Sequence, residues 1–153
     1  MFEHQETKHL PYTPAQLFDL VADVERYPQF LPWCQRVSII EHHDDGFTAR
    51  IEAGSGSLTG VFTSRDRLYK PPPEAREDPQ SVWRIDVDSH DGPFRRLVNA
   101  WTFTPQPEGC LVGFMIRFQF SSFMMNTLFQ PFFSHVARSM VDAFEKRART
   151  LYP

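Results

Sequence analysis

The sequence predicts an α+β domain: a curved antiparallel sheet of about seven strands, one or two short N-terminal helices and a long C-terminal helix. Three observations support this class. A capped helix start follows a first strand, residues 35–120 are dominated by strand patterns and turn signals, and residues 122–151 have helical periodicity. The chain has 153 residues and neither a repeat nor a linker, so we expect one domain spanning residues 1–153.

The first helix has a clear start signal after a strand at residues 2–10. Thr13 suits the N-cap position, Pro14 the first helical position, and Gln16 the returning side chain of a capping box. The helix should end or kink before Pro28, because the residue that precedes a proline disfavours the helical conformation.

The next segment, residues 26–34, combines two prolines with large apolar side chains. The prolines argue against a long helix and against a central strand. We interpret the segment as a short helix and a rigid loop, with Phe30, Leu31 and Trp33 turned inward.

Strands are expected through most of residues 35–120. They cover residues 37–42, 47–53, 58–69, 82–89, 97–104 and 110–120, separated by turn signals and by a proline-rich loop at residues 71–79. Residues 58–69 mix polar and apolar side chains on both faces, so their inward side stays open. The last strand has the clearest alternation, with one face made of Cys110, Val112, Phe114, Ile116, Phe118 and Phe120.

The C-terminal helix is expected to have two different halves. Its second half carries a narrow apolar stripe at helical spacing: Val136, Met140, Phe144, Ala148 and Leu151. Its first half is apolar around most of its circumference: Phe123, Met124, Met125, Leu128, Phe129, Phe132 and Phe133. This half is either a mobile lid or membrane-contacting surface, or additional core or a dimer contact. Pro131 is expected to bend the helix.

Composition and charge exclude several classes of protein. The formal net charge of −3 argues against a general nucleic-acid binder, so no DNA partner is expected. No run approaches the ~18 apolar residues that would span a bilayer. The N-terminus has neither the apolar segment of a signal peptide nor the features of a transit peptide, which predicts a cytoplasmic location. Cys34 and Cys110 are expected to be structural thiols.

Motifs of catalysis and metal binding are scarce. There is no Gly-rich phosphate loop and no Gly-x-Ser-x-Gly elbow. Residues 42–45 are interpreted as an exposed hairpin and not a metal site, because neighbours on a strand point to opposite faces. His135 is interpreted as an ordinary helix residue. The polar candidates on the inner faces are Asn99 and Asp86, and we therefore predict a protein without enzymatic activity, metal or cofactor.

One stretch resembles the signature of a known family. Residues 27–34, Tyr-Pro-Gln-Phe-Leu-Pro-Trp-Cys, are similar to the signature of the coenzyme-Q-binding START-domain family. Supporting pieces are Phe62-Thr63-Ser64-Arg65, Gly92-Pro93-Phe94 with Leu97, Trp101-Thr102-Phe103, and Met140-Val141 with Ala143-Phe144-Glu145 and Arg147-Ala148. The order of elements is similar to the helix-grip fold of START-like, polyketide-cyclase-like and pollen-allergen-like proteins, and the resemblance covers nearly the whole chain.

The resemblance implies a lipid-binding function. Family members bind ubiquinone or another polyprenyl lipid and act as carriers or chaperones in support of respiratory electron transport. Bacterial relatives are also described as ribosome-association toxins that block subunit joining, so a ribosomal subunit is an alternative partner. An enzyme of the cyclase or dehydratase type is a further alternative. Eukaryotic relatives carry a mitochondrial presequence, which this chain lacks, and this favours a bacterial cytoplasmic protein.

A helix gripped by a sheet leaves a space that side chains or a ligand must fill. The predicted ligand-binding residues are Leu31, Trp33, Phe94, Leu97, Asn99, Trp101, Phe103, Phe114, Phe118, Phe129, Phe132, Phe133 and Val136. Asn99 is expected to orient a quinone oxygen. A pocket of ~300–1,000 Å³ would not enclose a long polyprenyl tail. The tail would then protrude or remain in the bilayer, in keeping with peripheral contact at the inner membrane.

Overall fold

The computed structural model describes residues 1–153 and contains one antiparallel sheet of seven strands. The strand order is β1-β7-β6-β5-β4-β3-β2. Along the chain the elements are β1 (Phe2–Leu10), α1 (Pro14–Ala22), the 3-10 helix η1 (Val24–Gln29), β2 (Cys34–His43), β3 (Gly46–Ser55), β4 (Leu58–Tyr69), the 3-10 helix η2 (Pro73–Ala75), β5 (Trp83–Ser89), β6 (Phe94–Gln106), β7 (Gly109–Phe120) and α2 (Phe123–Leu151). The predicted fold class is confirmed.

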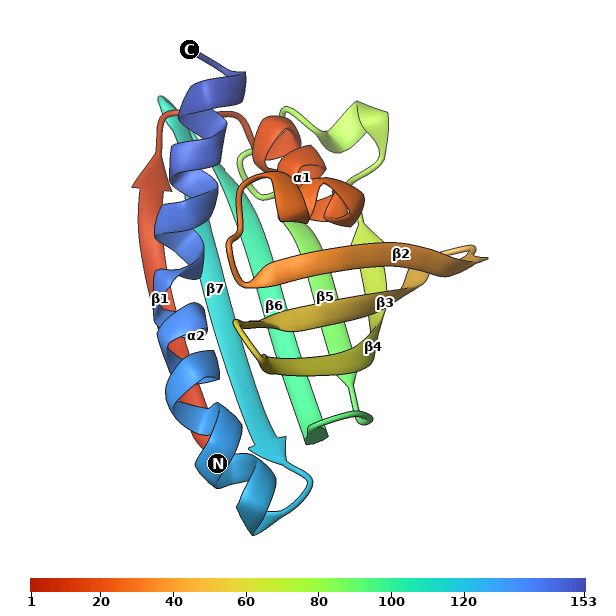
Figure 1. Ribbon diagram of the computed structural model, residues 1–153. Coiled ribbons are helices and arrows are strands. Elements are labelled where there is room, and N and C mark those ends of the chain that lie inside the picture. Colours follow the sequence, from red (N-terminus) through yellow and green to blue (C-terminus); the bar gives the residue numbers. More distant parts are fainter.

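The sheet curls around the two α-helices. In Figure 1, β2, β3 and β4 cross in front of β5 and β6, while α2 lies along β1 and β7. The short helix α1 covers one end and contacts β5, β6 and α2. The concave face of the sheet therefore meets α2 on one side and α1 on the other, and the interior lies between them.

The helix start at Thr13 is confirmed in detail. The backbone N–H of Gln16 donates to the Thr13 hydroxyl at 3.1 Å, and the Thr13 N–H donates to the Gln16 side chain at 3.0 Å. The helix ends at Ala22, and Pro28 lies within the separate helix η1. The Tyr27 hydroxyl donates to the Val21 carbonyl, which holds η1 against the end of α1.

Helix α2 begins with a cap at Ser122, whose hydroxyl accepts a hydrogen bond from the Met125 N–H at 3.1 Å. The helix continues through Pro131 to Leu151. Of the predicted stripe, Val136, Phe144 and Ala148 are buried. Leu151 is 44% exposed because it lies in the last turn, beyond the sheet.

Aromatic rings fill most of the interior. The larger buried cluster has 17 residues and includes both buried tryptophans, Trp83 and Trp101, packed against α1 and the end of α2. A second cluster of nine residues lies under the first half of α2 and consists of Ala53, Phe62, Phe94, Leu97, Phe118, Phe120, Phe129, Phe133 and Ala137. These rings pack edge-to-face and stacked, for example Phe94 against Phe133 with 5.0 Å between centroids.

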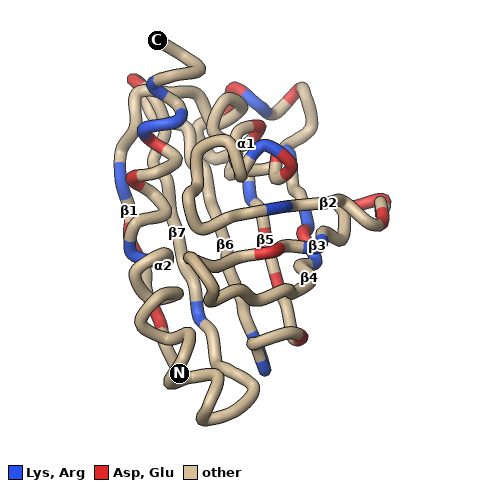
Figure 2. Tube along the Cα trace, in the orientation of Figure 1, with Lys and Arg blue, Asp and Glu red and all other residues tan.

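Charged side chains of both signs are interspersed over the molecule, as Figure 2 shows. In this view no part of the trace carries only Lys and Arg, in keeping with the net charge of −3. None of the helices combines the length and the apolar character that crossing a bilayer would require.

Candidate functional site

An interior cavity of about 90 Å³ lies between the sheet and the helices. Twelve of its 15 lining residues are hydrophobic. The strands contribute Ile51, Phe62, Ser64, Asp66, Ile85, Val87, Leu97, Asn99, Trp101 and Ile116, and the rest of the lining is Val21, Val24, Tyr27, Trp33 and Met140. The cavity is large enough for a few waters. It is well below the ~300 Å³ at which drug-sized ligand pockets begin.

A second hollow, a groove of about 240 Å³, opens at the surface beside α2. Its walls are the loop that precedes β2, the end of β3 and one face of α2. They consist of Leu31, Pro32, Trp33, Gly54, Ser55, Phe132, His135, Val136, Ser139 and Ala143. His135, exposed on α2, lies at this groove and not in the interior cavity.

Trp33 lines both the cavity and the groove. Its side chain is half-buried and packs against both large hydrophobic clusters. Its backbone carbonyl accepts a hydrogen bond from the Gly54 N–H at 2.9 Å, which fixes the main chain at this point. One indole side chain thus lines two spaces, of about 90 and 240 Å³, that together reach the lower end of the size range of ligand pockets.

The polar groups of the cavity come from β4 and β6. Ser64, Asp66 and Asn99 are 1%, 5% and 8% exposed. The Asn99 amide donates to the Met115 carbonyl at 2.8 Å. By contrast, the Ser64 hydroxyl oxygen and Oδ1 of Asp66 have no hydrogen-bond partner within the protein. Buried polar atoms without partners are uncommon and call for an explanation.

Burial raises the pKa of Asp66 to about 6, against the opposing effects of the Ser64 hydroxyl and the Arg65 charge. The pKa of Tyr27 is also raised, first by burial and then by the charge of Asp66. These shifts agree with the geometry, since a carboxylate is held in an apolar interior without a cation in the cavity lining.

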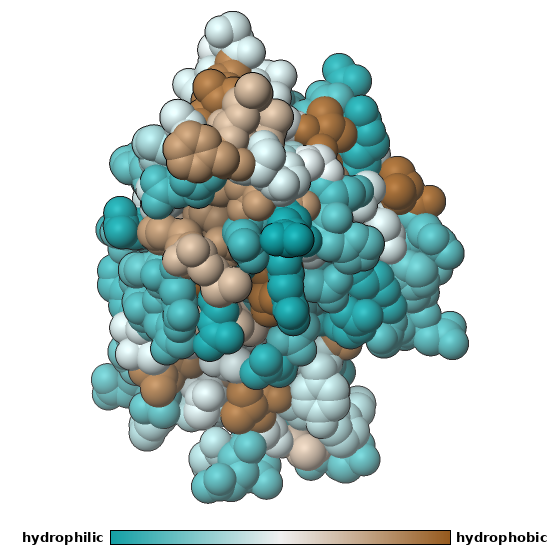
Figure 3. Space-filling view, turned by 90° about the horizontal axis from the view of Figure 1, so that it is seen from below, coloured by the Kyte–Doolittle hydropathy of each residue, from teal (hydrophilic) through white to brown (hydrophobic).

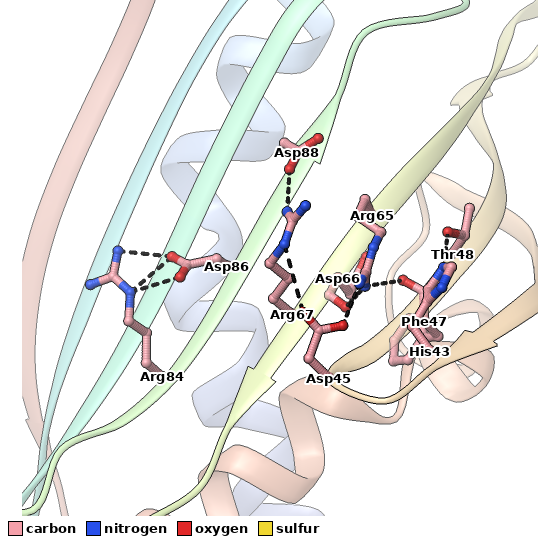
Figure 4. A network of polar contacts seen from close by, with 10 residues as sticks. All are labelled: His43, Asp45, Phe47, Thr48, Arg65, Asp66, Arg67, Arg84, Asp86 and Asp88. Atoms are coloured by element: carbon pink, nitrogen blue, oxygen red, sulfur yellow. Dashed lines mark hydrogen bonds and ion pairs between the residues drawn. The ribbon is translucent and has the colours of Figure 1, made fainter.

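The neighbouring charged residues point to the outer face of the sheet. In Figure 4, Arg65 bonds to Asp45 and to the backbone carbonyl of Asp66, the latter at 2.8 Å. In the same network Arg67 donates to Asp88 at 2.7 Å. Side chains alternate along β4, so Ser64 and Asp66 face the cavity while the two arginines face outward.

Asp86 was predicted as a polar group on an inner face, and this is wrong. Its carboxylate pairs with Arg84 on the outer face at 2.8 Å, and its side chain is 44% exposed. The reason is the alternation of β5, in which Trp83 and Ile85 point inward and therefore turn Asp86 outward.

The structure divides the predicted ligand-binding residues into three groups. Those that line the interior cavity are Trp33, Leu97, Asn99 and Trp101. Those at the groove are Leu31, Phe132 and Val136, again with Trp33. The remaining six, Phe94, Phe103, Phe114, Phe118, Phe129 and Phe133, are packed within the two large hydrophobic clusters.

Sequence reasoning missed the polar residues of β4. Ser64 and Asp66 lie in a strand whose other face carries Arg65 and Arg67, so both faces are polar in part and hydropathy does not orient the strand. Phe62 could have oriented the strand, because it is the only aromatic residue in its middle and an aromatic side chain favours the inner face. Ser64 and Asp66 share that face.

The other hollows and reactive groups fit a ligand site less well. A wider hollow of about 520 Å³ is a broad depression on the outer side of the sheet, and only three of its nine lining residues are hydrophobic. Burial raises the pKa of the Cys34 and Cys110 thiols to about 12, so both are protonated near neutral pH. No group of three His, Cys, Asp or Glu side chains is placed to hold a metal ion.

Known proteins resemble this chain over nearly its full length. The ribosome association toxin RatA of Pseudomonas aeruginosa is 35% identical over 149 residues, which are 97% of this chain and 96% of that protein. The mitochondrial coenzyme Q-binding protein COQ10 homolog B of Xenopus laevis is 29% identical, over 98% of this chain and 59% of that protein.

Solved structures agree on the fold. The solution structure of the 18 kDa protein CC1736 of Caulobacter crescentus has a TM-score of 0.70 and 35% identity, and the match covers 99% of each chain. The Zhui aromatase/cyclase of Streptomyces sp. R1128 has a TM-score of 0.74 at 15% identity, covering 97% of this chain and 93% of the cyclase. The model of the family described as polyketide cyclase / dehydrase and lipid transport matches residues 10–145. The chain therefore belongs to this family, and its fold is the START-like helix grip.

Proposed function

We propose that this protein is a non-catalytic carrier of a hydrophobic ligand, with ubiquinone or another polyprenyl lipid as the first candidate. The observation that carries the proposal is the arrangement around Trp33, whose side chain lines both an apolar interior cavity and a surface groove. The family description includes lipid transport, and one relative is named as a coenzyme Q-binding protein.

In this proposal the ligand enters along the groove beside α2. Rotation of the Trp33 indole joins the groove to the cavity, so that a ring-shaped head group occupies the interior and the tail leaves past Phe132 and Val136. Burial of apolar ligand surface at roughly 25 cal/mol per Å² would supply the affinity. Release needs only the reverse movement, as a carrier requires.

The ionisable groups support a binding role over a catalytic one. In the cavity lining these are Asp66 and Tyr27, and no histidine, lysine or arginine faces them. The Tyr27 hydroxyl already donates to the Val21 carbonyl. A cyclase or dehydratase would need a positioned acid and base in the cavity, and this lining offers one carboxylate.

We extend the proposal to contact with a membrane through the tip of α2. Phe123, Met124 and Leu128 are 86%, 66% and 48% exposed. They follow the end of β7, where Phe120 pairs with Phe94, and Arg95 and Arg96 follow Phe94 at the same end of the sheet. Figure 3 views the molecule from this end and shows hydrophobic surface gathered in the upper part of the view. Apolar side chains at the same end of the molecule as two cations suit an anionic membrane surface, where a carrier would collect its ligand.

The carrier role is tested by measuring ligand binding to the wild type and to a variant in which a larger side chain fills the cavity. Purified protein is titrated with a short-tailed ubiquinone analogue, and quenching of tryptophan fluorescence is followed, because Trp33 and Trp101 line the cavity. We expect saturable quenching. Val87→Phe adds a ring inside the cavity and should abolish quenching, whereas Leu111→Phe, at a site 38% exposed, should leave it unchanged. If the analogue does not bind, or if Val87→Phe binds it as well as the wild type does, the carrier proposal fails.

A second candidate function is association with a ribosomal subunit. It is favoured by the RatA protein of Pseudomonas aeruginosa, which matches this chain over 97% of its length. Sedimentation with purified ribosomal subunits distinguishes the candidates. A protein that acts only as a lipid carrier stays at the top of the gradient, while a ribosome-associating protein moves with a subunit.

A further inference from the structure

The polar end of the interior cavity has hydrogen-bond acceptors left over and few donors. Oδ1 of Asp66 and the hydroxyl oxygen of Ser64 have no partner within the protein. The Tyr27 hydroxyl donates to Val21 and one N–H of the Asn99 amide donates to Met115, which leaves only the Ser64 O–H and the second Asn99 N–H as donors beside the two oxygens of the Asp66 carboxylate. A ligand that complements this end of the cavity therefore carries a hydrogen-bond donor.

The three polar side chains lie on one wall. Asp66 pairs with Val87, and Val87 pairs with Asn99, so these residues form a single row across β4, β5 and β6. Neighbouring strands are about 4.8 Å apart, which places Asp66 and Asn99 roughly 10 Å apart along the row. Ser64 lies two residues from Asp66 and therefore on the same face of β4. The row is long enough to face a ring-sized head group once the cavity is joined to the groove.

No cation of the protein is available to Asp66. The cavity lining contains no lysine, arginine or histidine. Arg65, the next residue in the chain, is bonded on the outer face to Asp45 and to the Asp66 backbone carbonyl. Because a carboxylate accepts hydrogen bonds and a buried one without a cation is costly, a hydrogen-bond donor on a ligand would relieve this cost.

We propose that the cavity selects a neutral head group that bears a hydroxyl, with Asp66 accepting the hydrogen bond from that hydroxyl. For a quinone-type ligand this is the reduced, hydroquinone form and not the quinone, whose two carbonyl oxygens are acceptors like the wall itself. A cationic head group is disfavoured because twelve of the 15 lining residues are hydrophobic. The inference rests on the carrier function proposed above and specifies its ligand.

A pair of probes that differ in one donor tests the selection. Para-octylphenol and its methyl ether, para-octylanisole, have similar shape and hydrophobicity, but only the phenol has an O–H. Affinities are measured by isothermal titration calorimetry. Hydrogen bonds to charged groups are worth ~1.5–3 kcal/mol, so the wild type should bind the phenol roughly 10- to 100-fold more tightly than the ether.

Two variants make the assignment specific. Asp66→Asn replaces the carboxylate by an amide and should reduce the preference for the phenol to less than about threefold. The same exchange on the outer face, Asp86→Asn, should retain the preference. Circular dichroism checks that both variants are folded.

The outcomes separate this inference from the carrier function. If the wild type binds both probes equally, or Asp66→Asn keeps the full preference, the assignment of Asp66 is overturned while hydrophobic ligand binding stands. If the wild type binds neither the probes nor the ubiquinone analogue, the carrier function fails, and the ligand assignment fails with it.

Discussion

At the scale of single residues, Asp66 is the group whose environment departs most from expectation. It is a carboxylate 5% exposed on an inner face, next to apolar side chains. The strand pattern of residues 58–69 could not place it, since Ser64 and Asp66 alternate with Arg65 and Arg67 and neither face is purely apolar. Asn99 could be placed, because β6 alternates clearly around Leu97 and Trp101.

The pKa of Asp66 predicts a pH-dependent stability. Because folding raises this pKa from 3.8 to about 6, the native state favours the protonated form. The associated stability is fully present below pH 4 and is lost as the pH rises through 6, a loss of about 3 kcal/mol at ~1.4 kcal/mol per pKa unit. Asp66→Asn should therefore be more stable than the wild type at pH 7 by up to that amount, with the difference shrinking towards pH 4.

Urea unfolding of both proteins at pH 4, 5, 6 and 7 measures this difference. Asp91 does not titrate in this range, because hydrogen bonds from Thr63 outweigh burial and lower its pKa. The contribution of every group other than Asp66 cancels when the variant is compared with the wild type at each pH. A stability difference that does not change with pH would contradict the prediction.

At the scale of elements, the two halves of α2 show what helical periodicity can decide. The stripe of the second half was assigned correctly at Val136, Phe144 and Ala148, because one face alone is apolar. The first half is apolar all around, and periodicity could not separate its buried side, with Phe129 and Phe133, from the exposed Phe123. Phe129 and Phe133 thus belong to the core, as one interpretation expected, while a lid or membrane role of the exposed Phe123 stays a prediction.

The exposed side of this half predicts membrane binding. Phe123→Ser combined with Met124→Ser should lower the fraction of protein that sediments with vesicles containing phosphatidylglycerol several-fold, because less apolar surface enters the bilayer interface. The fold should be unaffected, since both side chains are mostly exposed. Leu151→Ser, exposed at the opposite end of α2, is the matched control and should bind as the wild type does. Equal sedimentation of all three proteins would exclude this contact.

The turn between β5 and β6 depends on Gly92. Its φ of +58° is in the left-handed region, and a Cβ there would lie 2.1 Å from the Val61 carbonyl oxygen. Gly92→Ala should therefore lower the free energy of unfolding by about 2 kcal/mol or more. Gly56 has a similar φ of +61° with nothing within 4 Å of its Cβ position, so Gly56→Ala should cost about 1 kcal/mol. Thermal unfolding of both variants should show Gly92→Ala as clearly the less stable.

At the scale of the whole molecule, the order of elements could be predicted but the size of the cavity could not. The order of elements follows from hydropathy alternation, helix caps and turn residues, which are local patterns that can be read from the sequence. The cavity depends on how rings from distant segments pack, such as Phe62 against Phe94 and Phe133. Six of the predicted lining residues became part of the packed interior for this reason.

The distinction between packed and exposed aromatic rings predicts different losses of stability when a ring is removed. Phe118 is 1% exposed and stacks on Phe2 with 4.8 Å between centroids. Phe118→Ala should cost ~3–5 kcal/mol, because it leaves a cavity in a filled cluster. Phe123→Ala, at a site 86% exposed, should change stability by less than about 0.5 kcal/mol. Chemical denaturation gives both values, and similar costs for the two variants would contradict the assignment of these rings.

The position of β1 has a consequence for how the chain folds. Its nine residues pair with β7 alone, in a register that joins Phe2 to Phe118 and Leu10 to Cys110. The remaining strands are joined by successive hairpins, so their contacts close over short stretches of chain. A nascent chain therefore keeps its first segment unpaired until β7 has been synthesised, and this contact of high sequence separation should form among the last steps of folding.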